Sequence, residues 1–328
     1  MKQVSMQDIA DHLGISRNSV SQALRDKDGV SEETKKAVIK TAHLLGYEYE
    51  SKTKDKGKLL LMATEFAFSQ TSFFGKIVAS VKKHCEINKF SLDTCTLSAD
   101  MIDKLLLPQN LSDYAGVLIM SHSSNEYINA VIASKIPTVL IDHHDPSLLS
   151  DAILSKNTDG AYLAVSLLLK NKHKRIGFIG DTAFSPSYLE RYRGYKRALE
   201  DSHITRDKNI EITEIEESQG ALFNSLKNVQ SMPEAWFCVN SGLAFMLNSY
   251  LQSEGYIIPD DISIICFDDT EFTRMAQPTL SNVATDLSYM GELAVSTMID
   301  RIKFPKKPFV HKQILPALNI LESTKLVP

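Results

Sequence analysis

Helix-capping residues and helix stops alternate so closely at the start of this chain that they confine its first part to short helices. Ser5, with Asp8 three positions later, matches a capping box, and Gly14 supplies a stop at the end of that helix. Ser16 and Ser31 begin two further helices, and apolar residues recur at helical spacing in all three. Two short helices joined by a glycine-containing turn and followed by a third are typical of a helix-turn-helix, whose second helix enters the major groove of DNA.

The outward positions of the second helix carry side chains that suit DNA contacts. Arg17 matches the O6 and N7 atoms of guanine, whereas Asn18 and Gln22 match N6 and N7 of adenine, so we predict that these residues read bases. The hydroxyls expected to contact phosphates belong to Ser16, Ser19 and Ser21. The spacing alone also allows a three-helix interaction module with a solvated polar face.

The charge distribution separates this N-terminal part from the rest of the chain. Residues 1–58 contain 11 of the 36 lysines and arginines and 9 of the 40 acidic residues, which leaves them at +2 and the remaining residues at −6. Positive charge is therefore concentrated where a DNA-contacting module needs it. A length of 328 residues predicts more than one domain, because a single core rarely extends that far.

Several classes of protein find no support in the sequence. The N-terminus has no apolar signal segment and no apolar run is long enough to span a membrane, so we expect a cytoplasmic protein without a membrane partner. The four cysteines have no metal-like spacing and are expected to be buried free thiols. Nucleotide-binding and hydrolase motifs are missing, and the adjacent His143 and His144 suit neither a metal pair nor a catalytic dyad. We therefore expect neither catalysis, a metal nor a cofactor.

From residue 58 onward, apolar strand-like runs alternate with helical stretches. The strand-like runs are residues 59–64, 90–95, 115–122, 138–144, 175–181, 209–215, 234–240 and 263–269, and helical patterns cover 75–86, 100–106 and 127–134. This alternation predicts an α/β architecture with parallel sheets. Asp142 and Asp268 stand at strand ends, where the ligands of open α/β sheets gather.

Residues 4–47 resemble the DNA-binding headpiece of the lactose/galactose-repressor family. The residues that carry the resemblance are Asp8, Ala10, Gly14, Ser16, Val20, Ser21, Val30, Ser31, Thr34, Val38 and Tyr47. Further family motifs follow along nearly the whole chain, among them TVLIDHH at 138–144 and PDDISIICFDD at 259–269. The resemblance implies an all-α helix-turn-helix headpiece and a periplasmic-binding-protein-like effector domain of two α/β lobes. It also places Arg17, Asn18 and Gln22 where the family reads bases, although the last is more often arginine.

The resemblance also implies domain boundaries. The headpiece is expected at 1–47, a basic linker at 48–58, and an effector-binding and dimerisation domain at 59–328. Lobe 1 is expected at about 59–156 and 286–316, and lobe 2 at about 157–285 and 317–328. The chain would then cross between the lobes three times, near 156–158, 284–287 and 316–318.

The linker departs from the family pattern. Family members continue after the tyrosine with a proline, an asparagine and a leucine that wedges into the minor groove, and here Lys56 stands where that leucine is expected. A lysine is a poor wedge, so we predict weaker bending of bound DNA than is usual for the family. Lys52 and Lys54 suit phosphate contacts, although a solvated tether that touches nothing is equally compatible with this sequence.

By resemblance, the effector pocket involves Asp142, Arg191, Asn240 and Asp268, together with Phe73 or Phe74. Carboxylates, an arginine and an amide match the donors and acceptors of a sugar, and an aromatic face covers a sugar ring. Taken without the family, the aspartates are equally compatible with helix caps, the arginine with a surface ion pair and the phenylalanines with core packing.

Three departures from the family pattern in this region argue against a ligand that is one of the simplest sugars bound by the members that conform best to the pattern. Ser241 replaces the aspartate of the family's Asn-Asp pair, and His143 replaces the arginine of its Asp-Arg pair. A polar position in the family's strand near 282–285 is also altered.

The functional expectation is a homodimeric repressor of a carbohydrate-catabolism operon, bound to a pseudo-palindromic double-stranded operator and controlled by a small carbohydrate effector. No leucine heptad tail follows the last lobe, so tetramerisation is not expected. The sequence leaves open a regulator that responds to a co-repressor, a sugar phosphate or a phosphocarrier protein. More remotely, it leaves open a sugar receptor without a DNA function.

Overall fold

The computed structural model describes residues 4–24, 29–45, 47 and 57–326. The chain divides into two compact units, Met1–Gly57 and Lys58–Pro328. The linker residues Lys52, Lys54 and Lys56 and the expected helix stop Gly46 lie outside the described residues. Within the described ranges, no helix is long and apolar enough to cross a membrane.

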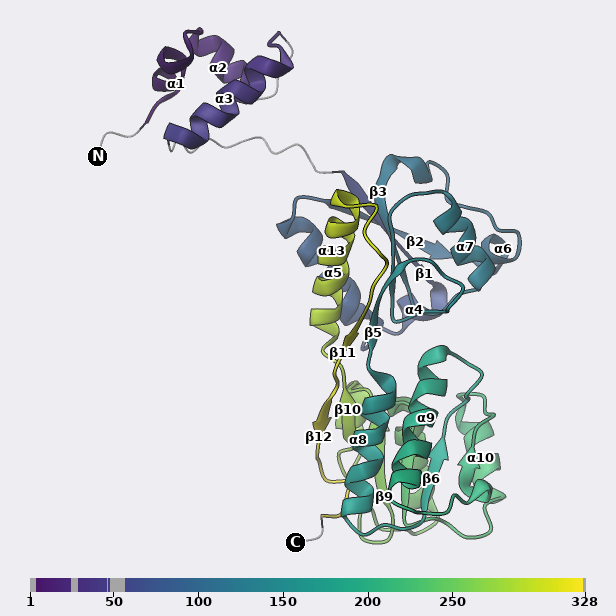
Figure 1. Cartoon of the computed structure of the whole chain (residues 1–328). Helices are drawn as coiled ribbons and strands as arrows, with labels where there is room; N and C mark the ends of the chain where they lie inside the picture. The colour runs from purple at the N-terminus through teal and green to yellow at the C-terminus, as the bar shows by residue number, and fades with distance from the viewer. Residues whose placement is uncertain (1–3, 25–28, 46, 48–56, 327–328) are drawn as a thin grey trace. The chain divides into compact units, whose positions relative to one another are not determined.

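The N-terminal unit consists of three helices around a small core (Figure 1). These helices are α1 (Met6–Leu13), α2 (Arg17–Leu24) and α3 (Glu32–Leu45). Ser5 and Asp8 form a reciprocal capping box, and Gly14 ends α1 in the left-handed conformation, at φ 65°. The core is made by Ile9, Ala10, Val20, Ala23, Leu24, Val38 and Ala42. The predicted helix-turn-helix fold is therefore confirmed.

The first lobe of the second unit is a parallel sheet with helices on both faces (Figure 1). Its strands, in the order β11-β5-β4-β3-β1-β2, are β1 (Lys58–Thr64), β2 (Ser91–Leu97), β3 (Tyr114–Met120), β4 (Thr138–Ile141), β5 (Asp151–Ser155) and β11 (His311–Ile314). The larger helices are α5 (Phe74–Ile87), α7 (Asn125–Ala133) and α13 (Leu287–Lys303), and the short ones are α4 (Glu65–Ser69), α6 (Ala99–Asp103) and η1 (Leu111–Asp113). Along β1, Leu59 and Leu61 pack with α5 and α13, whereas Leu60 and Met62 pack with α7. A strand with both faces covered must be apolar along its covered length, and residues 59–63 of β1 are apolar and buried.

The second lobe repeats the same winding. Its strands, in the order β12-β10-β9-β8-β6-β7, are β6 (Ile176–Ile179), β7 (Glu211–Ile212), β8 (Ala235–Cys238), β9 (Ser263–Phe267), β10 (Ser281–Ala284) and β12 (Ala317–Asn319). The helices are α8 (Asn157–Lys170), α9 (Pro186–Asp201), η2 (Lys208–Ile210), α10 (Gln219–Lys227), α11 (Ser241–Ser253) and α12 (Glu271–Met275). One continuous apolar core, centred on Trp236, Phe237 and Phe267, joins the sheet to these helices.

Three short segments connect the lobes: β5 leads into α8, β10 leads into α13, and β11 leads into β12. The hydroxyls of Thr285 and Ser155, 2.8 Å apart, tie two of these segments together. The strand β12 pairs antiparallel with β10, while the other strands of both sheets pair in parallel. The reason is geometric. In lobe 1, β11 runs toward the boundary between the lobes. The chain continues in the same direction, so β12 runs away from that boundary in lobe 2, whereas β10 runs toward it.

The cysteines are free thiols in this fold. Cys85, Cys238 and Cys266 are buried as expected, but Cys95 is half-buried on β2, so the expectation of burial is wrong for that residue. Burial raises the pKa of Cys85 to about 11, which keeps this thiol protonated and unreactive. The described residues contain no group of histidines, cysteines and carboxylates that could hold a metal ion.

Gly194 allows the close approach of two helices and provides a test of the lobe 2 packing. A Cβ atom at this position of α9 would lie 2.2 Å from the Thr158 carbonyl oxygen and 2.8 Å from the Ala161 Cβ, both on α8. We expect Gly194→Ala to lower the free energy of unfolding by about 2–3 kcal/mol through overpacking. Gly220→Ala on α10 is the control, because nothing lies within 4 Å of its added Cβ. Equal unfolding midpoints of the two variants in urea would contradict this packing.

Candidate functional site

Helix α2 presents a polar surface next to a buried stripe. Arg17 and Asn18, in its first turn, are exposed, whereas Ser19, Ser21 and Gln22 are half-buried. Val20, Ala23 and Leu24 face the core of the unit. The Ser16 hydroxyl accepts a hydrogen bond from the Ser19 backbone N–H at 3.0 Å and lies 2.9 Å from the Ser19 hydroxyl, so both serines spend part of their hydrogen-bonding capacity on the helix start. The DNA-contacting roles of these residues stay predictions.

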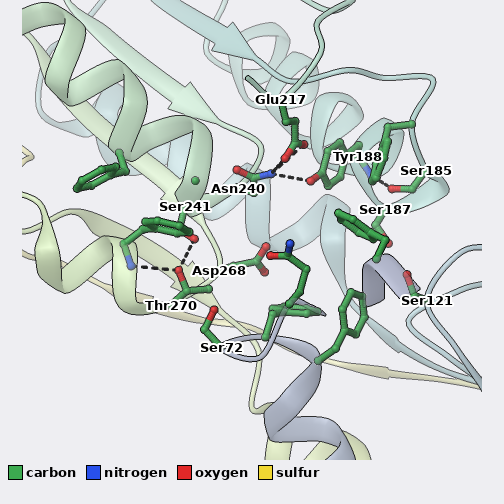
Figure 2. Close-up of a pocket in the computed structure, with 18 of the residues that line it drawn as sticks. Ser72, Ser121, Ser185, Ser187, Tyr188, Glu217, Asn240, Ser241, Asp268 and Thr270 are labelled. Atoms are coloured by element: carbon green, nitrogen blue, oxygen red, sulfur yellow. Dashed lines mark hydrogen bonds between the residues drawn. The ribbon is translucent and has the colours of Figure 1, made fainter. Parts of the chain in front are cut away.

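A second candidate site is a cavity of about 470 Å³ between the two lobes of Lys58–Pro328 (Figure 2). It lies where the carboxyl ends of the parallel strands of both sheets meet, which is the place expected for ligands of doubly wound sheets. Ser121, Asp142 and Asp268 follow β3, β4 and β9 and turn the chain at this edge with left-handed φ values of 70°, 56° and 71°. Such conformations are costly away from glycine and are concentrated at functional sites.

Arg191 and Asp268 form a buried ion pair at the floor of the cavity. Arg191 Nη1 donates to Asp268 Oδ2 at 2.8 Å and to the Val239 carbonyl oxygen at 2.8 Å, and the guanidinium lies 3.8 Å from the centre of the Phe267 ring. The Arg191 side chain is 2% exposed, so the alternative of a surface ion pair is wrong. Asp268 does not cap α12 either, because Thr270 does. Burial raises the pKa of Asp268, and the neighbouring arginine opposes that rise.

Asp142 lines the cavity with a buried carboxyl oxygen. It is half-buried, and its Oδ1 atom is shielded from solvent without a hydrogen-bond partner among the described residues. Burial raises its pKa to about 7; the Arg191 guanidinium limits the rise and the neighbouring carboxylates add to it. The chain runs from β4 to β5 without a helix, so Asp142 is not a helix cap. A buried acceptor without a partner is poised for a ligand donor.

Asn240 combines a structural and a site role. Its Oδ1 accepts a hydrogen bond from the Leu243 backbone N–H and so caps α11. Its Nδ2 donates to the Tyr188 hydroxyl at 2.6 Å and to both Glu217 oxygens at 2.9 Å (Figure 2). Neither Tyr188 nor Glu217 was expected at the site from the sequence. Tyr188 lies three positions before Arg191, one helical turn away on the same face of α9, and this spacing was a usable signal. Glu217 lies in a loop, where no periodic signal exists.

Aromatic rings line the cavity from both lobes. Phe73 and Phe74 both face it, with their ring centres 4.9 Å apart, and the buried Phe74 also belongs to the lobe 1 core. The sequence analysis missed two further groups. One consists of Phe66, His122, Phe184 and Tyr188, and the other of Phe245 and Phe272, whose ring centres are 5.5 Å apart.

A hydrogen-bonded chain links the cavity to the lobe boundary. His144, from the segment after β4, lies 2.8 Å from Glu190 of α9, and this hydrogen bond raises the pKa of His144. Glu190 accepts from Asn157 Nδ2 at 3.0 Å, and Asn157 Oδ1 accepts from Arg191 Nε at 2.9 Å. The lobes are thus joined through residues that also orient Arg191.

Two residues that depart from the family pattern, Ser241 and His143, differ in their surroundings. Ser241 bonds to Thr270 at 2.7 Å, in place of a charged contact. His143 is buried, neither of its ring nitrogens has a hydrogen-bond partner among the described residues, and burial lowers its pKa to about 4. Both positions therefore contribute neutral groups near neutral pH.

Comparison with known proteins gives consistent matches along the chain. Residues 5–49 match the model for bacterial regulatory proteins of the lacI family, and residues 165–324 match a periplasmic binding protein-like domain. The ribose operon repressor of Haemophilus influenzae is 28% identical over 97% of this chain and 98% of its own length. The HTH-type transcriptional repressor PurR of Actinobacillus pleuropneumoniae is 27% identical over 94% of each chain.

Solved structures share the fold. A structure described as a complex of the transcriptional regulator CelR with cellobiose has a TM-score of 0.73 at 20% identity and covers 98% of this chain and 99% of its own. A lac repressor dimer bound to operator has a TM-score of 0.71 at 21% identity and covers 99% of this chain and 100% of its own. The two-lobed architecture implied by the sequence is therefore confirmed.

Proposed function

Because this chain belongs to the lacI family of bacterial regulatory proteins and is a DNA-binding transcriptional regulator, we propose that it represses a carbohydrate-catabolism operon from the cytoplasm. In this proposal a homodimer places two α2 helices on a pseudo-palindromic operator. Arg17, Asn18 and Gln22 read bases, and Ser16, Ser19 and Ser21 contact phosphates. The relatives with assigned roles are transcriptional repressors, which supports regulation rather than catalysis.

The observation that carries the effector part of the proposal is the unpartnered Asp142 carboxyl beside the Arg191–Asp268 pair in a cavity of about 470 Å³. A small carbohydrate would donate hydroxyl hydrogens to Asp142 and Glu217 and place its ring against the aromatic side chains. Two structures with this fold support a sugar as the ligand type: the CelR complex with cellobiose, and a LacI family transcriptional regulator from Enterococcus faecium with bound ribose, which has a TM-score of 0.70 at 22% identity. We propose that this ligand releases the operator.

Selection of duplexes from a random pool by the purified full-length protein tests this function. We expect a pseudo-palindromic consensus whose binding weakens when the right sugar is added. If every duplex binds no better than random competitor at moderate salt, with or without sugars, the regulator proposal fails. Tighter operator binding in the presence of the ligand would instead establish co-repression.

Substitutions in α2 test the base-reading assignment. We expect Arg17→Ala and Asn18→Ala each to weaken binding to the selected operator about tenfold, because a bidentate side chain–base pair contributes ~1–3 kcal/mol of discrimination. Binding to random duplex should change little. Lys40→Ala, at an exposed position of α3, is the control and should leave the preferred sequence unchanged. Fluorescence-anisotropy titrations measure these affinities. If selection with both α2 variants returned the same consensus as the unaltered protein, the assignment would be refuted.

The linker sequence leads to a prediction about DNA shape. Because Lys56 occupies the place of the family's wedging leucine, we expect little bending at the operator centre, and more in a Lys56→Leu variant. Circular-permutation gel mobility of the bound operator measures this angle. A sharp central kink produced by the unaltered protein would overturn the expectation.

A further inference from the structure

The charge balance of the cavity is unfavourable for an anionic ligand. Of the described residues that line it, Arg191 is the one arginine or lysine, against three carboxylates, Asp142, Glu217 and Asp268. Asp268 already pairs with the Arg191 guanidinium, because Nη1 and Nη2 donate to its carboxylate. Nη1 also donates to the Val239 carbonyl oxygen, and Nε donates to Asn157. Burial lowers the pKa of His122, so this ring adds no charge near neutral pH. An anion entering the cavity would therefore meet carboxylates without a free cation to offset them.

The hydrogen-bonding groups at the centre of the cavity are mainly acceptors. Asp142 and Glu217 offer carboxylate oxygens, and Asn240 has committed its Nδ2 to Tyr188 and Glu217. The serine and threonine hydroxyls around them both donate and accept. Such a set is complementary to a ligand that brings several hydroxyl donors, and it repels a phosphate or carboxylate, which brings only acceptors.

The cavity has an apolar region on each side of this polar centre. In Figure 2, Ser241 and Thr270 lie on one side of Asn240 and Asp268, and Ser121, Ser185 and Ser187 lie on the other. Phe245 and Phe272 belong to the first side, beside Ser241 and Thr270 on α11 and α12. On the second side, the Phe184 ring lies 5.9 Å from Phe66 and 4.6 Å from His122. Two separate aromatic surfaces can each cover one face of a ring.

The size of the cavity agrees with more than one ring. A volume of about 470 Å³ corresponds to ~15 water molecules at ~30 Å³ each. The covalently bonded atoms of a sugar pack more densely than water molecules. A single pyranose would therefore leave part of the cavity, and one of the two aromatic regions, without contact.

We infer that the cavity selects an uncharged ligand of two linked rings, a disaccharide or a glycoside, and rejects the phosphorylated form of the same sugar. The inference rests on the proposed function, because it assigns the chemical class of the effector at that site. It follows from the saturated Arg191, the surplus of carboxylates and the two aromatic regions flanking Asn240 and Asp268.

A binding panel without DNA tests the inference separately from the proposed function. The full chain is titrated calorimetrically with three neutral sets: the disaccharides cellobiose, maltose, lactose, sucrose and trehalose, aryl glucosides, and the monosaccharides glucose, ribose and galactose. The charged set contains the 6-phosphates of the hexose-containing sugars and ribose 5-phosphate, and adenine and guanine complete the panel. We expect a neutral two-ring compound to bind at least a hundredfold tighter than its phosphorylated form. Tightest binding of a sugar phosphate, a monosaccharide or a nucleobase overturns the inference, and so does failure of every two-ring compound to bind. An operator that fails to respond to a two-ring ligand that does bind would count against the proposed function alone.

Two substitutions, one in each aromatic region, identify how much of the cavity the ligand fills. We expect Phe184→Ala and Phe272→Ala each to weaken binding of the two-ring ligand about tenfold. Phe304→Ala, at a residue 42% exposed outside the cavity, is the matched control and should bind normally. If only one of the two cavity variants loses affinity while both keep the circular dichroism of the unaltered protein, the ligand occupies one region and the inference fails.

Discussion

Replacing Arg191 with methionine should lower the free energy of unfolding by about 3–5 kcal/mol and abolish the response to effector. Methionine approximates the volume of the arginine stem but leaves the buried Asp268 carboxylate without its partner, and an uncompensated buried charge costs that much. The loss should grow between pH 5 and pH 8. Arg191 lowers the pKa values of both Asp142 and Asp268 in the folded protein. Without Arg191 these pKa values rise, so ionising the two carboxyls at high pH costs more stability.

Urea unfolding of purified variants measures this effect, and two further variants sharpen it. Arg197→Met, on the same helix, removes an exposed arginine that lies 3.7 Å from Asp201, and should change stability by no more than about 0.5 kcal/mol. Adding Asp268→Asn to Arg191→Met should recover part of the loss, because the unpaired charge is then gone and asparagine tolerates the left-handed backbone. An unfolding midpoint of Arg191→Met equal to that of Arg197→Met would show that the ion pair does not stabilise the fold.

Asp142→Asn should move ligand affinity and stability in opposite directions. We expect effector binding to weaken about a hundredfold, since a hydrogen bond from a ligand hydroxyl to a buried carboxylate contributes about 1.5–3 kcal/mol. The ligand-free protein should become more stable, because Asp142 Oδ1 has no hydrogen-bond partner in the described part of the chain and burial opposes ionisation of the carboxyl. Such a trade-off is expected where a site is prepared for a ligand rather than for the fold.

The pH dependence gives the sign of this effect. The pKa of Asp142 is raised to about 7 in the folded chain, so the stability associated with its neutral form is present at low pH and is lost as the pH rises toward 7. We expect the stabilisation by Asp142→Asn to be ~2–3 kcal/mol larger at pH 8 than at pH 5. Conversely, effector affinity of the unaltered protein should increase as the pH rises through 7, because the ionised carboxylate is the better acceptor. Calorimetric titration of a sugar that binds tests the pH dependence of affinity. Thermal unfolding of the unaltered protein and of Asp142→Asn at each pH tests the pH dependence of stability. A constant difference in stability across that range would contradict them.

Much of the architecture was predictable because it depends on local patterns. Ser5 and Asp8 form the expected capping box, and Gly14 adopts the left-handed conformation. The strand-like runs at 59–64 and 263–269 correspond to the strands β1 and β9, although β9 ends at Phe267. The sequence did not predict segments whose secondary structure depends on pairing with residues far away in the chain. The short strands β11 and β12 have no strong periodicity of their own, and they exist because the chain passes along the free edges of both sheets.

The cavity shows the same division at the level of single residues. The positions of Asp142 and Asp268 after strands indicated site residues, and the family resemblance implied Asn240. The hydrogen-bond partners and the burial of these side chains were not predictable, because both depend on the other lobe or on distant helices. Glu217 is 23 residues from its partner Asn240, and Phe184 meets Phe66 and His122 across the lobe boundary.

The sequence by itself determined the helix-turn-helix headpiece, the α/β architecture and the strand ends at which a ligand would lie, because caps, stops and hydrophobic period act within a few residues. The division of the α/β part into two lobes was implied by the family resemblance. Only the tertiary structure decided that Asp268 neutralises Arg191 and that aromatic rings from separate segments line both sides of the cavity. It also decided that Asp142 Oδ1 has no hydrogen-bond partner among the residues with described positions. Charge balance in a buried site is a sum over side chains brought together by folding, and no local pattern encodes that sum.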